Sequence, residues 1–130
     1  MIKLCYKEYP CKMSLGAMKQ FKQSTGKDLW CTLLQFMECY GESVNDSVVV
    51  RMRKLYEIVD FETAANLFYA LIRAEDKSVS LQEIEDGMFK VGWLPTERAG
   101  DLSEPWPLVL VPVAHEINKQ FETDASAAKK

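Results

Sequence analysis

The stretch that sets the expected fold is Asp28-Leu-Trp-Cys-Thr-Leu-Leu-Gln-Phe-Met-Glu-Cys-Tyr-Gly41. Asp28 is a good N-cap, because its carboxylate can accept hydrogen bonds from the free N–H groups of a first helical turn. The apolar residues that follow recur at helical spacing and cover a face that is wide for a surface helix, namely Leu29, Trp30, Leu33, Leu34, Phe36, Met37 and Tyr40. The stretch therefore predicts a helix that ends at Gly41 and lies in the centre of the core.

Start and stop signals on both sides of this stretch predict further helices. Before it, Ser14 can cap a helix with Leu15, Met18 and Phe21 on one face, and Gly26 can end that helix. After it, three more helices are expected to begin at Asn45–Asp46, at Asp60, and at Ser80 with Glu83 as a capping box; the second contains Ala64, Ala65, Leu67, Phe68, Leu71 and Ile72, and Gly92 ends the third. We expect Trp30, Leu34, Phe68 and Leu71 to be buried together.

The N-terminal segment has the alternating pattern of a β-hairpin. Apolar residues alternate with polar ones on either side of Lys7-Glu8, which predicts two short strands within residues 2–13. A hairpin alone is marginally stable in water, so this one must pack on the helices or pair with another chain. Its open edge is a candidate for self-association, and the residues concerned are Ile2, Leu4, Tyr9 and Cys11.

The C-terminal third predicts a loop followed by one more helix. Residues 93–107 are rich in proline and are expected to form an ordered loop. The last helix should run to about Phe121, with Pro112 in or near its first turns, and residues 122–130 should form a flexible tail. The expected fold is mostly α, with a short N-terminal β-hairpin packed on a bundle of five to six helices in a single domain of residues 1–121.

The composition is that of an ordinary globular domain, and the net charge does not favour binding to a polyanion. The chain has 130 residues, of which 48% are hydrophobic and 27% charged, and its net charge is -3. Neither nucleic acid nor an anionic membrane is an expected partner, and the basic cluster of Arg51, Arg53 and Lys54 is expected to be a solvated helix face. No stretch predicts a signal peptide or a transmembrane helix, so we expect a cytoplasmic protein.

The sequence offers few residues for catalysis. His115 is the only histidine, and it is expected to be a partly buried structural imidazole on the last helix. Glycine-rich phosphate loops, dinucleotide fingerprints and nucleophile elbows do not occur. We therefore expect no enzyme activity and no cofactor; a small enzyme with a dispersed site is the alternative, which a deep polar pocket around His115 would support.

Metal binding is not expected either. The four cysteines at positions 5, 11, 31 and 39 match no zinc spacing, and in a cytoplasm they should be thiols buried as small hydrophobic groups. The segment around Glu83 is similar to the second half of a calcium loop. If Glu83 were the twelfth ligand, however, Ile72 and Ala74 would stand at the first and third ligand positions and Lys77 at the turn glycine, which excludes calcium.

The remaining candidates are surface residues that could bind another protein. Trp93, Leu94, Trp106 and Leu108 cluster in or beside the proline-rich loop. Tryptophans in loops are frequent at protein interfaces, but a small domain also uses them to close its core. Both interpretations of these four residues remain open from the sequence.

Several strings, taken in order, are similar to the tail assembly chaperones of long-tailed, siphovirus-type bacteriophages. The resemblance starts with the hairpin and Ser14-Leu-Gly-Ala-Met-Lys-Gln-Phe-Lys-Gln-Ser-Thr-Gly-Lys-Asp-Leu-Trp30. It continues with Leu67-Phe-Tyr-Ala-Leu-Ile-Arg-Ala-Glu-Asp76, Val79-Ser-Leu-Gln-Glu-Ile84 and a late helix near Trp106-Pro-Leu108. These motifs are structural, so the order of the elements carries the resemblance. Pro112 and the four cysteines lie outside the family's pattern.

The resemblance implies a function in tail assembly. Such chaperones bind the tape measure protein, keep this long helical chain soluble and help to recruit tail tube subunits, and they are absent from the mature virion. Many are made in two lengths by a ribosomal frameshift, and this chain resembles the short form, made in the host cytoplasm. We also expect self-association, through the hairpin edge of residues 2–13 or the Trp93–Trp106 loop, because repeated weak contacts along one client raise the effective concentration of each. A cytoplasmic protein-binding adaptor or small regulator with another client is the alternative.

Overall fold

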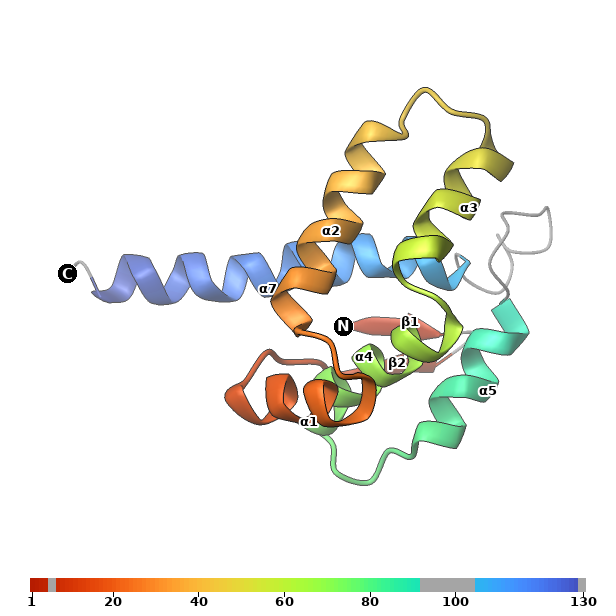
Figure 1. Cartoon of the computed structure of the whole chain (residues 1–130). Helices are drawn as coiled ribbons and strands as arrows, with labels where there is room; N and C mark the ends of the chain where they lie inside the picture. Colours follow the sequence, from red (N-terminus) through yellow and green to blue (C-terminus); the bar gives the residue numbers. More distant parts are fainter. Residues whose placement is uncertain (5–6, 92–104, 129–130) are drawn as a thin grey trace.

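The computed structural model describes residues 1–4, 7–91 and 105–128, with side chains described as far as Phe121. Within these ranges the chain forms a two-stranded antiparallel sheet and six α-helices (Figure 1). In chain order the elements are β1 (Ile2–Leu4), β2 (Lys7–Tyr9), α1 (Leu15–Thr25), α2 (Leu29–Glu42), α3 (Val48–Ile58), α4 (Phe61–Arg73), α5 (Leu81–Val91) and α7 (Trp106–Ala128). The predicted fold class is confirmed: the protein is mostly helical with a short N-terminal hairpin.

Side-chain caps begin three of the helices at the residues that the sequence predicted. The Ser14 hydroxyl accepts from the backbone N–H of Ala17 at 3.0 Å at the start of α1. The carboxylates of Asp28 and Asp60 likewise accept from N–H groups of the first turns of α2 and α4, at 2.8 and 2.9 Å. Gly26 ends α1 with φ of 75°, a left-handed conformation that favours glycine.

The predicted C-terminus of α2 and the predicted N-terminus of α3 are each wrong by one or two residues. Helix α2 continues through Gly41 to Glu42, and Ser43 is its C-cap. Helix α3 starts after Ser47, whose hydroxyl accepts from the N–H of Val50 at 3.4 Å. Asp46 does not cap this helix, because its carboxylate pairs with the ammonium of Lys54 at 2.7 Å.

The predicted capping box of α5 forms only in part. The Ser80 hydroxyl accepts from the N–H of Glu83 at 3.1 Å, as expected. The Glu83 carboxylate, however, turns to the hairpin and accepts from Lys7 Nζ and from the Tyr9 hydroxyl, each at 2.6 Å. These two hydrogen bonds lower the pKa of Glu83. The hydrogen bonds from Lys7 and Tyr9 to Glu83 thus connect β2 to α5. The predicted end of this helix, Gly92, lies outside the described residues.

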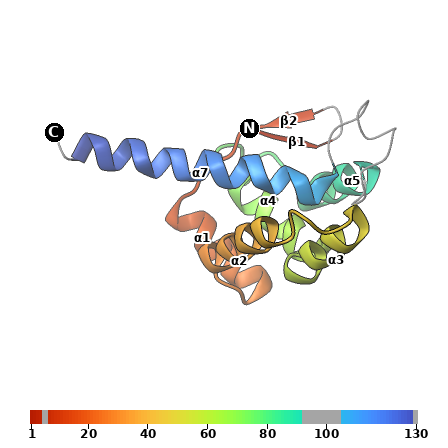
Figure 2. The same cartoon turned by 90° about the horizontal axis from the view of Figure 1, so that it is seen from above.

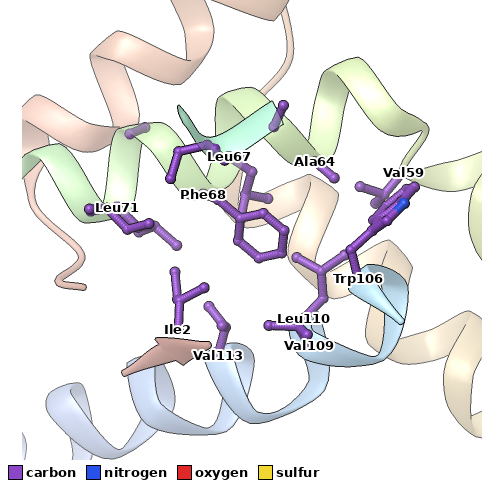
Figure 3. Close-up of a cluster of buried hydrophobic side chains, with 14 of the residues drawn as sticks. Ile2, Val59, Ala64, Leu67, Phe68, Leu71, Trp106, Val109, Leu110 and Val113 are labelled. Carbon is purple, nitrogen blue, oxygen red and sulfur yellow. The ribbon is translucent and has the colours of Figure 1, made fainter. Parts of the chain in front are cut away.

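Helix α4 occupies the centre of the core, which the sequence assigned to α2. It packs against α1 on one side and α5 on the other. Phe68 and Leu71 point to a third side, where Ile2 of β1 and Leu110 of α7 meet them (Figure 3). Most of its residues are consequently buried, namely Thr63, Ala64, Ala65, Leu67, Phe68, Ala70, Leu71 and Ile72.

Helix α7 crosses the molecule with the hairpin on one side and α2 and α3 on the other (Figure 2). Pro112 lies inside it and is exposed, and because proline has no N–H it cannot donate the helical hydrogen bond to the carbonyl of Leu108. The sequence predicted an end near Phe121, but the helix extends to Ala128, and its C-terminal part projects beyond the body of the protein (Figure 1). Alanine is the strongest helix former, which favours this extension over residues 125–128.

Candidate protein-binding site

The structure places Trp106 in the core rather than on a binding surface. It is the first residue of α7, not a loop residue, and only 1% of its surface is exposed. Its ring packs edge-on against Phe61, with centroids 6.0 Å apart, and lies 5.9 Å from the ring of Tyr56. Its assignment as a protein-binding residue is therefore wrong, because a partner cannot reach a side chain enclosed by α3, α4 and α7.

The other members of that predicted cluster are not brought together with Trp106 on a surface. Leu108 is half-buried against the core. Trp93 and Leu94 lie outside the described residues. The described part of the predicted cluster therefore supplies packing, not an exposed patch.

The hairpin residues proposed for self-association also belong largely to the core. Ile2, Leu4 and Tyr9 are buried, and Ile2 points toward Leu71 of α4 (Figure 3). Their side chains are therefore closed to a partner, because the hairpin lays its apolar face on the helices. β1 and β2 pair in register, with Ile2 opposite Tyr9.

Cys11, the fourth residue of that group, is half-buried. Its thiol donates a 3.5 Å hydrogen bond to the Glu116 carboxylate. Burial, together with this carboxylate, raises the pKa of Cys11 to about 11, so the thiol stays protonated and weakly nucleophilic at neutral pH. Cys31 is exposed on α2, which contradicts the expectation of buried cysteines.

His115 is exposed on α7, whereas the sequence predicted a partly buried imidazole. Among the described residues, no three His, Cys, Asp or Glu side chains gather closely enough to hold a metal ion. No helix in the described part of the chain has the length and apolar character that a membrane span requires.

An apolar depression lies between α2 and α7, and we call it the α2–α7 groove. Its volume is about 230 Å³. Helix α2 contributes one wall and α7 the other, and the lining residues are Trp30, Leu33, Leu34, Met37, Ala114, His115, Ile117 and Asn118. Leu34, which the sequence placed in the core, has 67% of its surface exposed here. The groove thus has apolar walls with His115 and Asn118 as its polar members, as expected of a protein-binding site.

The helical repeat of α2 explains why this helix is apolar on two faces. Leu29, Leu33 and Phe36 point inward and are buried. Trp30, Leu34 and Met37, spaced by four and three residues, form a second row on the groove side. The sequence showed that this apolar face is wide. The structure shows that the width comes from a groove wall and not from a central position in the core.

Phe121 of α7 contacts Trp30, one of the residues that line the groove. Its ring meets Trp30 edge-on, with the ring centroids 5.2 Å apart. Both rings remain partly accessible, because Phe121 is exposed and Trp30 only half-buried. The aromatic pair therefore extends the apolar surface beyond the groove, toward the projecting part of α7.

Three exposed valines, which we call the valine tip, lie in the connection between α2 and α3 and in the first turn of α3. The tip consists of Val44, Val48 and Val49, with 62%, 55% and 61% of their surfaces exposed. Helix α3 buries Met52 and Leu55, whereas the valines of its first turn face solvent. The exposure of these valines is seen only in the tertiary structure, because no other element in the described part of the chain covers them.

Comparisons of the chain with protein-family models, with curated proteins and with solved structures find no match.

Proposed function

We propose that this protein is a tail assembly chaperone of the long-tailed phage type, and that it holds an amphipathic helix of the tape measure protein in the α2–α7 groove. The observation that carries the proposal is the two-thirds exposed Leu34 at the wall of an apolar groove. A groove walled by two helices suits the apolar stripe of a third helix. The order of sequence elements that resembles this family supplies the identity of the client.

The rest of the proposal follows from that family. The chaperone keeps its client soluble by covering apolar surface that would otherwise aggregate. It acts in the host cytoplasm, helps to recruit tail tube subunits through a longer frameshifted form, is absent from the mature virion, and has no catalytic activity or cofactor. An adaptor or small regulator with another client is the second candidate, since the same groove could hold a different amphipathic helix.

Co-expression with the cognate tape measure protein tests the function and the site together. We expect the wild-type chain to keep the tape measure protein soluble and to co-purify with it in several copies. Leu34→Glu should abolish both, because it places a charge in the apolar contact. Leu15→Glu is the matched control: Leu15, on α1, has the same 67% exposure and does not line the groove.

Each result has a defined meaning. If the well-folded wild-type chain leaves the tape measure protein insoluble, the chaperone function is wrong. If Leu34→Glu and Leu15→Glu both retain the client, the function holds but the groove is not its site. Capture of a different amphipathic client by the same groove would instead favour the adaptor.

A further inference from the structure

Helix α7 is tied to the N-terminal segment by hydrogen bonds between residues that are far apart in the sequence. The Gln120 side chain forms two of them with the backbone of Met13: its Oε1 accepts from the Met13 N–H at 3.3 Å, and its Nε2 donates to the Met13 carbonyl oxygen at 3.1 Å. One turn earlier, the Glu116 carboxylate accepts from the Cys11 thiol at 3.5 Å and from the Met1 ammonium at 2.5 Å. We call the pair of hydrogen bonds between Gln120 and Met13 the α7 brace.

Met13 is itself held by the helices around it. Its side chain is buried, with 2% of its surface exposed. The N–H of Lys12, the residue before it, donates to the carbonyl oxygen of Leu71 on α4 at 3.0 Å. Ser14, the residue after it, caps α1. The brace therefore connects α7 to α1 and α4 through a short segment that is fixed at both ends.

The brace and the α2–α7 groove lie on opposite sides of α7. Ala114 and Asn118 line the groove, and Glu116 and Gln120 each follow one of them by two residues. Two residues turn an α-helix by about 200°, so the second pair points away from the first. The elements show the same arrangement, because α7 has α2 and α3 on one side and the hairpin on the other (Figure 2). The N-terminal segment thus supports α7 from the side opposite the groove.

The groove side gives α7 less support. A hollow of about 230 Å³ lies between the two walls, so contacts that would hold α7 at a fixed distance from α2 are fewer there. Trp30 and Phe121 meet edge-on at one point, and the buried Val113 and Ile117 attach α7 to the core. Pro112, just before these residues, removes one helical hydrogen bond. The sideways position of this part of α7 consequently depends on the brace.

We propose that Gln120 is a positioning residue for the α2–α7 groove: through its two hydrogen bonds with Met13 it sets the distance between the α7 wall and the α2 wall. Gln120 acts through α7, since it does not itself line the groove. A wall held at a fixed distance pre-organises the groove, so a client helix does not have to order α7 when it binds. This role rests on the function proposed above, because it assigns the groove to a client.

The distance between the two walls can be measured without a client. Spin labels are attached to Glu38→Cys on α2 and His115→Cys on α7, two exposed positions, after the four natural cysteines are replaced by serine. Electron paramagnetic resonance then gives the distance between the labels. Gln120→Ala should broaden or shift the distance distribution, because α7 loses its attachment to Met13. Lys119→Ala, at an exposed neighbouring position, is the matched control and should leave it unchanged. Equal distributions for Gln120→Ala and the wild type would overturn the proposal.

Hydrogen exchange repeats the test in a chain that keeps its natural cysteines. In Gln120→Ala the amides of residues 113–121 should exchange about tenfold faster than in the wild type, because two hydrogen bonds that restrain this part of α7 are lost. The amides of α4 should exchange at the wild-type rate. Equal acceleration in α4 and α7 would show that Gln120 only stabilises the whole fold, and it would overturn the positioning role.

A client assay separates this inference from the proposed function. Gln120→Ala should weaken binding of the tape measure protein by about tenfold. Asp60→Ala loses the cap of α4 and does not touch the groove, so it controls for lower stability and should bind like the wild type. If Gln120→Ala alters the wall distance but the wild type also fails to bind the client, the positioning role stands and the chaperone function fails. If wild type and Gln120→Ala bind the client equally, the function stands and the positioning role is wrong.

Discussion

Helices α2 and α4 have similarly apolar sequences but different surroundings. Helix α4 is covered by α1, α5, the β-hairpin and α7, and it buries most of its residues, with the stripe of Glu62, Asn66, Tyr69 and Arg73 accessible to solvent (Figure 3). Helix α2 packs against α3, α1 and α7, yet it leaves Trp30, Leu34 and Met37 along a groove. The small residues Ala64 and Ala65 allow neighbours to approach α4 closely, whereas bulky side chains occupy the outer row of α2.

This contrast shows how one apolar pattern can serve either stability or binding. Apolar surface that other elements cover stabilises the fold, and apolar surface that remains open is available to a partner. The difference is measurable, because it predicts that substitutions in α4 change the free energy of unfolding, while those in the outer row of α2 change binding.

The largest effect should come from the centre of α4. Phe68→Ala removes a fully buried ring and should lower the free energy of unfolding by about 3–5 kcal/mol, since the surrounding elements cannot close the cavity. Urea denaturation followed by circular dichroism measures the change. A loss below 1 kcal/mol would show that α4 is not the centre of the core.

A loss of similar size is expected at the start of α7. Trp106→Ala should cost about 3–5 kcal/mol, because the indole packs between Phe61 and Tyr56. The same variant, at a temperature where it remains folded, should still retain the client. A stable variant that loses the client would restore Trp106 as a binding residue and contradict its place in the core.

A smaller effect is expected at the cap of α4. Asp60→Ala should cost about 1 kcal/mol, because the N–H of Thr63 loses its acceptor. That hydrogen bond lowers the pKa of Asp60, so its contribution is complete above the unfolded-state pKa near 4 and is lost as the pH falls below it. The stability difference between wild type and variant, measured by denaturation between pH 7 and pH 2, should therefore shrink in acid.

Asn at the same position provides the control for that titration. Asp60→Asn keeps a side-chain acceptor for the N–H of Thr63 but cannot ionise. Its stability should be close to that of the wild type and should not show the Asp60 contribution to the acid dependence. A difference between wild type and Asp60→Ala that stays constant down to pH 2 would contradict this assignment.

The smallest effect should be found in the outer row of α2. Leu34→Ala should change the free energy of unfolding by no more than about 0.5 kcal/mol, because its side chain is already largely in water. The neighbouring Leu33→Ala is the matched control and should cost about 2–5 kcal/mol, because Leu33 is buried. Equal losses for the two substitutions would remove the distinction between the inner and outer rows.

Much of the fold could be predicted because its signals are local. The caps at Ser14, Asp28 and Asp60 act within one helical turn, and the alternation around Lys7-Glu8 specifies the hairpin. One error arose because a distant partner competes for a side chain. Glu83 leaves its predicted capping partner for the Lys7 ammonium and the Tyr9 hydroxyl, which are more than seventy positions away.

The candidate protein-binding site was harder to predict from the sequence than the fold. Trp106 had two interpretations from the sequence, and only its packing against Phe61 decided for the core. The groove needs residues of α2 and α7 that are some eighty positions apart, and no local signal joins them. The valines of the tip have the same hydrophobicity whether they are buried or exposed.

The sequence by itself determined the helical class, the hairpin, most helix starts and the surplus of apolar surface on α2. The tertiary structure decided that α4 is central, that α2 borders a groove and that the valine tip faces water. The physical reason is that caps and periodicity act through neighbours along the chain, whereas the burial of a helix depends on which other elements cover it.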